Sequence, residues 1–314
     1  MKQNIVEMLR EEAINKLFAI SSFSSSFTTW KDEINRLSPT KTNRQILDLG
    51  DHLSDIFRTT GTPGRGQGDV AGGGAAWEAF VCWYLNLCLI GRRTVVIKHN
   101  KQLIPQPVSD AITVNYKNFI SNTESDLIAI TFPDEPEYSC DAETISIMDT
   151  DGLPVPTHIG TRKKAYNLFN ILNALCHRDF NKLEIHIIQC KTNWNENAQI
   201  PMLWDMVYSA NEFRNDVTVG REGYSISNIS RFTYSFVTVP TTKWDKIKHT
   251  ATCVKRVTNL SGGNYWGCKT ESNVANSIKE MLGRNLNTGA PNDHLSTLKT
   301  ELSNLKTTYS YFGL

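Results

Sequence analysis

The sequence predicts an α/β protein built on a central mixed β-sheet with helices on both faces, and three observations support this class. Short runs rich in β-branched residues, at 94–98, 126–132 and 183–191, are typical of buried strands. Segments with helical periodicity lie between and around them. The 314 residues, of which 40% are hydrophobic, are enough for one large domain or two closely joined ones. Strands that alternate with helices favour a sheet covered on both sides.

Residues 3–57 are predicted to be helical in three pieces. A Ser/Thr-rich stretch, SSFSSSFTT at 21–29, separates the first two pieces, and a turn at 38–40 can cap the third. The three helices are expected at 3–20, 30–37 and 43–57.

A glycine-dense segment at 60–74 follows, and two interpretations of it are open. Such a composition is typical of a mobile surface loop. The alternative is a loop that orders against a DNA backbone, using Arg65 and the close approach that glycine permits. A strongly apolar helix is predicted next, at 75–90, and Gly91 stands where a residue that ends a helix is expected.

The rest of the chain continues the alternation of strands and helices. Residues 133–180 are predicted to leave the sheet as an insertion, which ends in an amphipathic helix at 161–179. Further strands are expected at 112–116 and 232–239, and further helices at 199–212, 243–257, 271–284 and 293–306. We therefore expect one compact unit with a helical N-terminal region (1–60), a core (61–240) and a mainly helical C-terminal region (241–314) that serves DNA recognition or dimerisation.

Charge and cysteine content narrow the class of protein. A net charge of +1 argues against a histone-like nucleic-acid binder, but it permits a cleft in which Lys and Arg are concentrated. The seven cysteines form no CxxC pair and suit reduced thiols in a cytoplasm. The N-terminus has acidic residues where a signal peptide would be apolar, and the longest apolar run, 75–90, is too short to cross a bilayer. We expect a cytoplasmic protein that does not enter a membrane.

Polar residues at the ends of two predicted strands suggest a site for phosphodiester hydrolysis. Asp126 begins one strand, and Gln189 and Lys191, which share a face because they are two residues apart, end another. The Asp126 carboxylate, the Gln189 amide oxygen and the backbone carbonyl of Cys190 are oxygen ligands of the kind that Mg²⁺ prefers. Lys191 would then orient the attacking water or stabilise the charge on the phosphorane.

Structural interpretations of the same features stay open. A lysine at the end of a buried strand commonly extends its ammonium group to solvent. The acidic residues at 134–137 are typical of an exposed loop. Other chemistries are disfavoured by missing motifs: the histidines lack zinc-ligand spacing, and neither GxxxxGK[ST] nor GxSxG occurs.

These residues resemble the motifs of the PD-(D/E)XK nuclease superfamily, in particular its type II restriction endonucleases. Ser125-Asp126 matches the first motif element, and Gln189-Cys190-Lys191 matches the second as a Q-x-K variant. The helix at 75–90 resembles the helix before the catalytic hairpin of that family, which often carries a glutamate that faces the site, here Glu78. The resemblance covers residues 70 to 210 and implies a restriction endonuclease-like core.

The resemblance also implies an activity and its partners. It implies a Mg²⁺-dependent, sequence-specific endonuclease for double-stranded DNA, with Mn²⁺ able to substitute, that acts as a homodimer in the bacterial cytoplasm. A cognate DNA methyltransferase would protect the host. Four residues directly after the catalytic lysine are candidates for DNA contact, although a polar turn before the next helix would explain them equally: Asn193, Trp194, Asn195 and Asn197.

One departure from the family pattern keeps other functions open. Gln189 replaces the usual acidic residue and removes one negative charge from the metal site, for which Glu78 can compensate. A non-catalytic DNA-binding protein on the same fold is the first alternative, and a structure-selective repair or recombination nuclease is the second.

Overall fold

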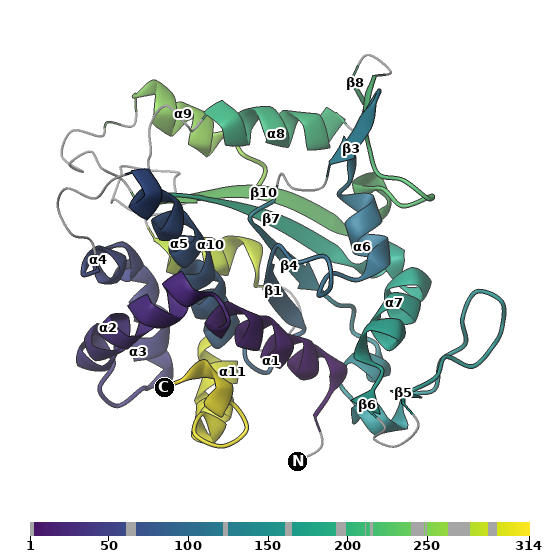
Figure 1. Ribbon diagram of the computed structural model, residues 1–314, viewed down its shortest axis with the longest axis horizontal. Coiled ribbons are helices and arrows are strands. Elements are labelled where there is room, and N and C mark those ends of the chain that lie inside the picture. Colours follow the sequence, from purple (N-terminus) through teal and green to yellow (C-terminus); the bar gives the residue numbers. More distant parts are fainter. Residues whose placement is uncertain are drawn as a thin grey trace.

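The protein is a three-layer α/β structure in which helices cover both faces of a central sheet (Figure 1). The computed structural model describes residues 3–60, 67–121, 125–160, 165–192, 199–210, 212–213, 216–239, 248, 250–262, 277–287 and 294–314. The predicted fold class, a mixed sheet flanked by helices with helical additions at both ends of the chain, is confirmed.

The central sheet is mixed and has the strand order β1-β4-β7-β10. Strand β4 is antiparallel to both of its neighbours, whereas β10 runs parallel to β7. The strands span Thr94–Lys98 (β1), Leu127–Thr131 (β4), Glu184–Lys191 (β7) and Arg231–Thr238 (β10). Helix α8 (Gln199–Ala210) lies between β7 and β10 in the chain and makes their parallel pairing possible. The predicted strands at 94–98, 126–132, 183–191 and 232–239 are therefore correct to within a residue or so at each end.

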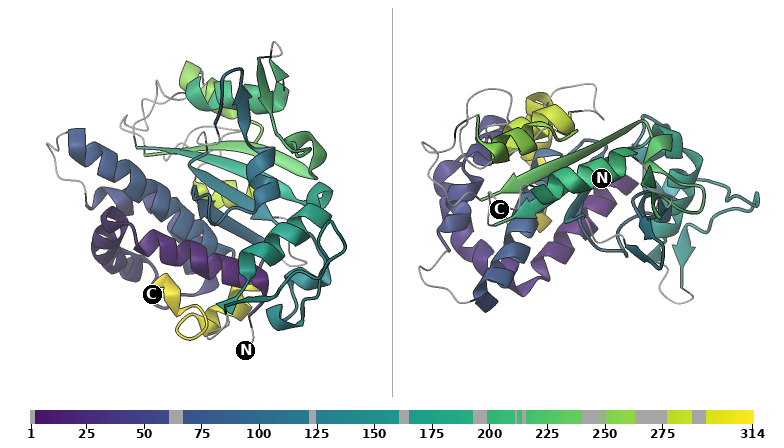
Figure 2. Two further views of the ribbon diagram at one scale, coloured as in Figure 1. Left: turned by 45° about the vertical axis from the view of Figure 1, so that its right-hand side comes forward. Right: turned by 90° about the horizontal axis from the view of Figure 1, so that it is seen from above.

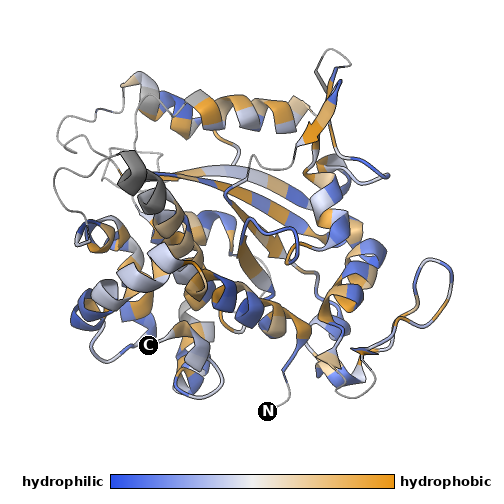
Figure 3. Ribbon diagram, viewed as in Figure 1, coloured by the Kyte–Doolittle hydropathy of each residue, from blue (hydrophilic) through white to orange (hydrophobic). Residues whose placement is uncertain are grey.

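Each face of the sheet packs against its own hydrophobic cluster, because successive side chains of a strand point in opposite directions. Ile185 and Ile187 of β7 belong to one cluster, which also includes side chains from α6 (Gln106–Ala111), α7 (Leu168–Arg178) and α8. Ile188 and Cys190 belong to the other, which is built mainly on α5 (Gln67–Cys88). Figure 3 shows apolar residues concentrated in the central strands and α5. Because β7 is covered on both faces, its polar residues Glu184, His186 and Gln189 are buried together with its apolar ones.

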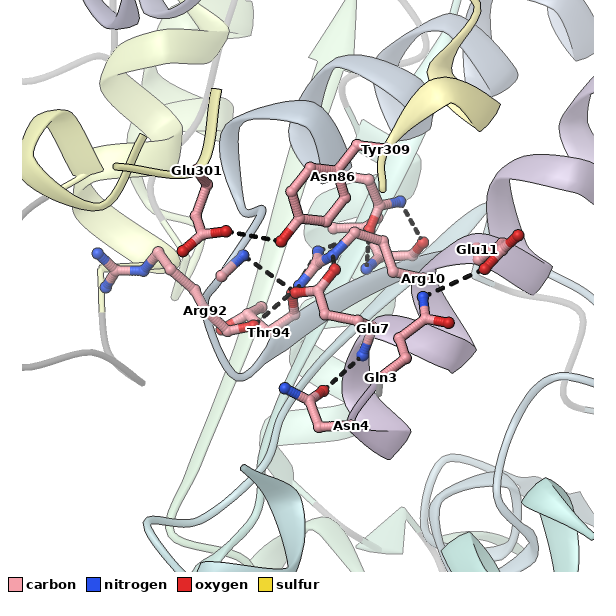
Figure 4. A network of polar contacts seen from close by, with 12 residues as sticks. Gln3, Asn4, Glu7, Arg10, Glu11, Asn86, Arg92, Thr94, Glu301 and Tyr309 are labelled. Atoms are coloured by element: carbon pink, nitrogen blue, oxygen red, sulfur yellow. Dashed lines mark hydrogen bonds and ion pairs between the residues drawn. The ribbon is translucent and has the colours of Figure 1, made fainter. Parts of the chain in front are cut away.

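The N-terminal helices are attached to the sheet through a buried arginine. Arg10, on α1 (Ile5–Phe18), is fully buried and donates hydrogen bonds to Glu7 and to the backbone carbonyls of Arg92 and Thr94 at 2.8 and 2.9 Å (Figure 4). It also bonds to the amide oxygen of Asn86 on α5 at 3.3 Å. These bonds satisfy the buried charge and join α1, α5 and the start of β1.

Three predictions in the N-terminal part are wrong. The Ser/Thr-rich stretch 21–29 is not a break but the first half of α2 (Ser21–Leu37). Phe23, Phe27, Trp30 and Ile34 recur at helical spacing and are buried, so their packing outweighs the weak helix propensity of serine. The helix predicted at 75–90 begins earlier, at Gln67, because an anchored helix gains one hydrogen bond for each residue that it adds. The third predicted helix is divided into α3 (Asn43–Asp48) and α4 (Leu53–Arg58) with a 3₁₀ turn between them.

A second, smaller sheet was not predicted as a unit. It has the order β3-β2-β9-β8 and lies beside one end of α8 (Figure 2). The strands are Val114–Tyr116 (β2), Phe119–Ser121 (β3), Glu212–Phe213 (β8) and Val217–Val219 (β9). The insertion holds a two-stranded pair, His158–Ile159 (β5) with Ala165–Tyr166 (β6), so the helix predicted at 161–179 begins only at Leu168.

The C-terminal region is mainly helical where the structure describes it. The helices are Thr252–Thr258 (α9), Ile278–Asn285 (α10) and His294–Glu301 (α11). Helices α10 and α11 add side chains to the α5 side of the core. None of the described helices combines the length and the apolar character needed to span a bilayer.

Candidate functional site

One end of the central sheet gathers the polar side chains of three strands. Lys98 pairs with Leu127, and Leu127 pairs with Ile188, so the ends of β1 and β7 meet the start of β4. The backbone N–H of His99 donates to the carbonyl of Asp126 at 2.9 Å and extends the β1–β4 pairing by one step. Residues that are directly opposite on antiparallel strands share a face. His99, Asp126 and Gln189 therefore form a row across one face of the sheet.

Asp126 and Lys191 are in contact, as the strand pattern predicts. The Asp126 Oδ2 atom accepts a hydrogen bond from the backbone N–H of Cys190 at 2.7 Å and lies 3.5 Å from Nζ of Lys191. Both side chains are partly buried, with 18% and 31% of their surfaces exposed. The contact with Cys190 fixes the carboxylate beside the end of β7. A charge-assisted bond of this kind is stronger than one between neutral groups.

The backbone of Cys190 is directed toward Asp126. Its N–H points to the β4 side of the strand, and the N–H and carbonyl of one residue in an antiparallel pair face the same neighbour. The β4–β7 pairing ends at Leu127 and Ile188, so the Cys190 carbonyl lies beyond the last ladder pair. The thiol of Cys190 is on the opposite face and buried. Burial and the nearby carboxylates of Asp126 and Glu78 raise its pKa well above the ordinary value, so the thiol is neutral.

Glu78 approaches the same end of the sheet from α5. Its carboxylate forms an ion pair with the ammonium group of Lys98, and the two side chains are 20% and 21% exposed. Burial raises the pKa of Glu78, Lys98 opposes this shift, and the charge of Asp126 adds to it. The charges of Asp126 and Lys191 act on Glu78, although Lys98 lies on the α5 face of the sheet and Asp126 lies on the other face. The two carboxylates at this end of the sheet are balanced by two lysines.

Gln189 is placed differently from a simple metal ligand. It lies on the predicted face, but only 5% of its surface is exposed, and its Oε1 atom accepts a hydrogen bond from the hydroxyl of Tyr234 at 3.0 Å. The amide oxygen that the sequence offers to a metal is thus already bonded to a tyrosine of β10.

Three residues near this end of the sheet were not predicted. Lys98 ends the strand TVVIK as Lys191 ends its own strand, so the pattern that pointed to Lys191 could also have pointed to Lys98. Burial lowers the pKa of His99, and Lys101 and Lys98 add to the shift, so its imidazole is neutral at pH 7. His99 Nδ1 is 3.2 Å from the Ser125 hydroxyl, and within the described chain its buried Nε2 atom has no hydrogen-bond partner. Tyr234 carried no signal, because its role depends on strand order.

The donor set at this end of the sheet suits a hard cation. Within the described ranges, no three His, Cys, Asp or Glu side chains are grouped to hold a metal. Mg²⁺ requires fewer protein ligands than such a group would supply, because it is usually held by one or two carboxylates and keeps several waters. The carboxylates of Glu78 and Asp126 and the carbonyl of Cys190 supply oxygen only. These oxygens are of the chemical type that Mg²⁺ prefers, and each carboxylate would have to exchange its lysine contact for the ion.

The acidic loop and the other polar residues of β7 have structural partners. Asp134, Glu135 and Glu137 form ion pairs with Arg93, Lys182 and Arg178, as an exposed acidic loop would. His186 is buried and shares a hydrogen bond of 2.6 Å with Thr233. Five predicted DNA contacts lie outside the described residues: Arg65, Asn193, Trp194, Asn195 and Asn197.

No protein-family model and no curated protein matches this sequence. The assignment of a function therefore depends on the geometry of the site and on the motif resemblance alone.

Proposed function

We propose that the protein is a Mg²⁺-dependent endonuclease that hydrolyses phosphodiesters of double-stranded DNA, as type II restriction enzymes do. One observation carries the proposal. Asp126, the Cys190 backbone and Lys191 meet at the paired ends of two antiparallel strands, and Glu78 reaches the same end of the sheet from the preceding helix, where it pairs with Lys98. This is the combination of groups that the resemblance to PD-(D/E)XK nucleases implies.

The roles of these residues follow from their chemistry. Asp126, Glu78 and the Cys190 carbonyl would hold the Mg²⁺, with Mn²⁺ as a substitute. The bound cation would supply a Lewis acid for the phosphate and a water of lowered pKa. Lys191, held 3.5 Å from Asp126, places a positive charge beside the reacting phosphate and stabilises the charge that develops there.

The remaining parts of the proposal concern partners. Most short recognition sites are two-fold symmetric, so a homodimer is the expected assembly. A restriction enzyme also requires a cognate methyltransferase in the same cell, which places the protein in a bacterial cytoplasm. The recognition segments are expected in the loops beside the site and in the C-terminal region.

A digest of a sequenced, unmethylated phage DNA tests the proposal. Purified wild-type protein with Mg²⁺ should give discrete fragments, and Lys191→Ala and Asp126→Asn should give none. Lys182→Ala is the matched control, because Lys182 also pairs with carboxylates but lies at the opposite end of the sheet. A smear, or selective cutting of branched DNA, would instead indicate a non-specific or repair nuclease.

The second candidate is a non-catalytic DNA-binding protein on the same fold. It is favoured by one observation: Gln189 replaces an acidic ligand, and its amide oxygen is bonded to Tyr234. DNA that is bound but left uncut under both Mg²⁺ and Mn²⁺ would establish this candidate and refute the nuclease.

A further inference from the structure

The position of Tyr234 determines the direction in which the Gln189 oxygen points. Strands β4 and β10 lie on opposite sides of β7. Gln189 is opposite Phe236 on β10, so Tyr234 is two residues nearer to the start of that strand. An amide oxygen bonded to Tyr234 is therefore directed toward β10 and toward the start of that strand. Asp126 lies on the other side, next to β4.

Tyr234 is itself rigidly held. Its side chain is fully buried, and its backbone N–H donates to the hydroxyl oxygen of Ser261 at 2.9 Å. Ser261 in turn donates its hydroxyl and its backbone N–H to the carboxylate of Asp205 on α8, at 2.7 and 2.9 Å. This chain of bonds joins β10, α8 and the segment after α9. Fixing the partner in this way fixes the amide of Gln189 as well.

The two ends of an amide diverge and have opposite hydrogen-bonding character. The oxygen only accepts and the nitrogen only donates. Because the oxygen is directed toward Tyr234, the NH₂ group is the end of the Gln189 amide that is available to donate a hydrogen bond at the candidate site. In the described part of the chain, no hydrogen bond is formed by that nitrogen.

We infer that Tyr234 is a positioning residue that turns Gln189 into a hydrogen-bond donor for a phosphate oxygen of the DNA, in place of a metal ligand. The inference rests on the proposed nuclease function and deepens it. A neutral donor suits an anionic phosphate, whereas a carboxylate at the same position would repel it. The cation is then held by Asp126 and Glu78 without Gln189.

Measurements of metal binding and of DNA binding distinguish Gln189 as a donor to phosphate from Gln189 as a metal ligand. The variants are Gln189→Ala, Tyr234→Phe and the double variant. Tyr208→Phe is the matched control, since Tyr208 is also buried and its hydroxyl bonds to the Ile112 carbonyl at 3.1 Å. Mn²⁺ affinity is measured by electron paramagnetic resonance on DNA-free protein. DNA affinity is measured by fluorescence anisotropy in EDTA, with a short duplex cut from the phage DNA of the digest above. Circular dichroism checks that each variant is folded.

Both single variants should bind Mn²⁺ within about twofold of wild type and bind the duplex about tenfold more weakly, as expected for one lost hydrogen bond to a charged group. The double variant should be no weaker than Gln189→Ala, because Tyr234 acts only through Gln189. A tenfold loss of Mn²⁺ affinity in Gln189→Ala would overturn the inference, and so would unchanged duplex binding in Tyr234→Phe. Wild-type protein that binds neither Mn²⁺ nor DNA would refute the proposed function, and the inference with it.

Discussion

Replacing Lys98 with methionine should strengthen metal binding, although Lys98 lies in the candidate site. Methionine keeps the length and the apolar stem of lysine and removes its charge. The ammonium group of Lys98 is in contact with the Glu78 carboxylate, one of the two carboxylates available to a cation. A divalent ion bound there must displace this ammonium group or remain close to it. Without Lys98 that competition disappears.

The size of the effect follows from Coulomb's law. Two cations that share one carboxylate are on the order of 5 Å apart, and a charge of +2 then repels a charge of +1 by about 1.7 kcal/mol even in the dielectric of water. The side chains of Glu78 and Lys98 are about one-fifth exposed, so the effective dielectric is below that of water and the repulsion is larger. Screening by salt makes the repulsion smaller. We therefore expect Mn²⁺ to bind Lys98→Met at least about tenfold more tightly.

The assay is a Mn²⁺ titration at pH 8 and low salt. Alkaline pH is required because burial raises the pKa of Glu78 and Lys98 opposes that shift, so the variant needs a higher pH to keep the carboxylate charged. Lys101→Met is the matched control, since Lys101 is nearby in the chain but exposed, and it should change the affinity less than twofold. Unchanged or weaker Mn²⁺ binding by Lys98→Met would refute a cation site at Glu78.

Two further predictions concern stability. Arg10→Met should lower the free energy of unfolding by about 3–5 kcal/mol in a urea titration. The reason is that Glu7 and two backbone carbonyls stay buried without the hydrogen bonds that Arg10 donates. A loss below about 1 kcal/mol would contradict this expectation. Burial lowers the pKa of His186, and its contact with Glu184 opposes this, so below about pH 6.5 the unfolded chain takes up a proton that the folded protein resists. Stability should therefore fall between pH 7 and pH 5, by up to about 1.4 kcal/mol per pH unit from this residue, and His186→Asn should show a shallower slope in denaturant titrations.

The central strands could be predicted because their physical signal is local. Strand β7 is a short run of eight residues that includes three β-branched isoleucines, a composition and a length that favour a strand over a helix. The Ser/Thr-rich half of α2 could not be predicted from propensity, because its stability comes from packing: Phe23 packs against Phe27, and Phe27 packs against the distant ring of Trp83. The second sheet consists of strands of two or three residues, too short for any periodicity to be evident.

The candidate site shows the same division between local and distant information. The approach of Asp126 to Lys191 follows from the ends of two strands, provided that the strands are neighbours. The bond between Tyr234 and Gln189 depends on which strand occupies the other side of β7 and on its register, and neither is written in the local sequence. The pairing of Glu78 with Lys98 likewise depends on how α5 crosses β1.

The charge balance of the site gives a physical reason for glutamine at position 189. Glu78, Asp126, Lys98 and Lys191 sum to zero, so the partly buried cluster is compensated without a metal. A glutamate at 189 would add an unpaired charge at a position that is almost fully buried. Under the proposed function the neutral cluster has a consequence for binding: a cation that took over a carboxylate would release a lysine, and a DNA phosphate would then pair with that lysine. Metal and DNA should each bind more tightly when the other is present, and by the same factor, because coupling between two sites is reciprocal.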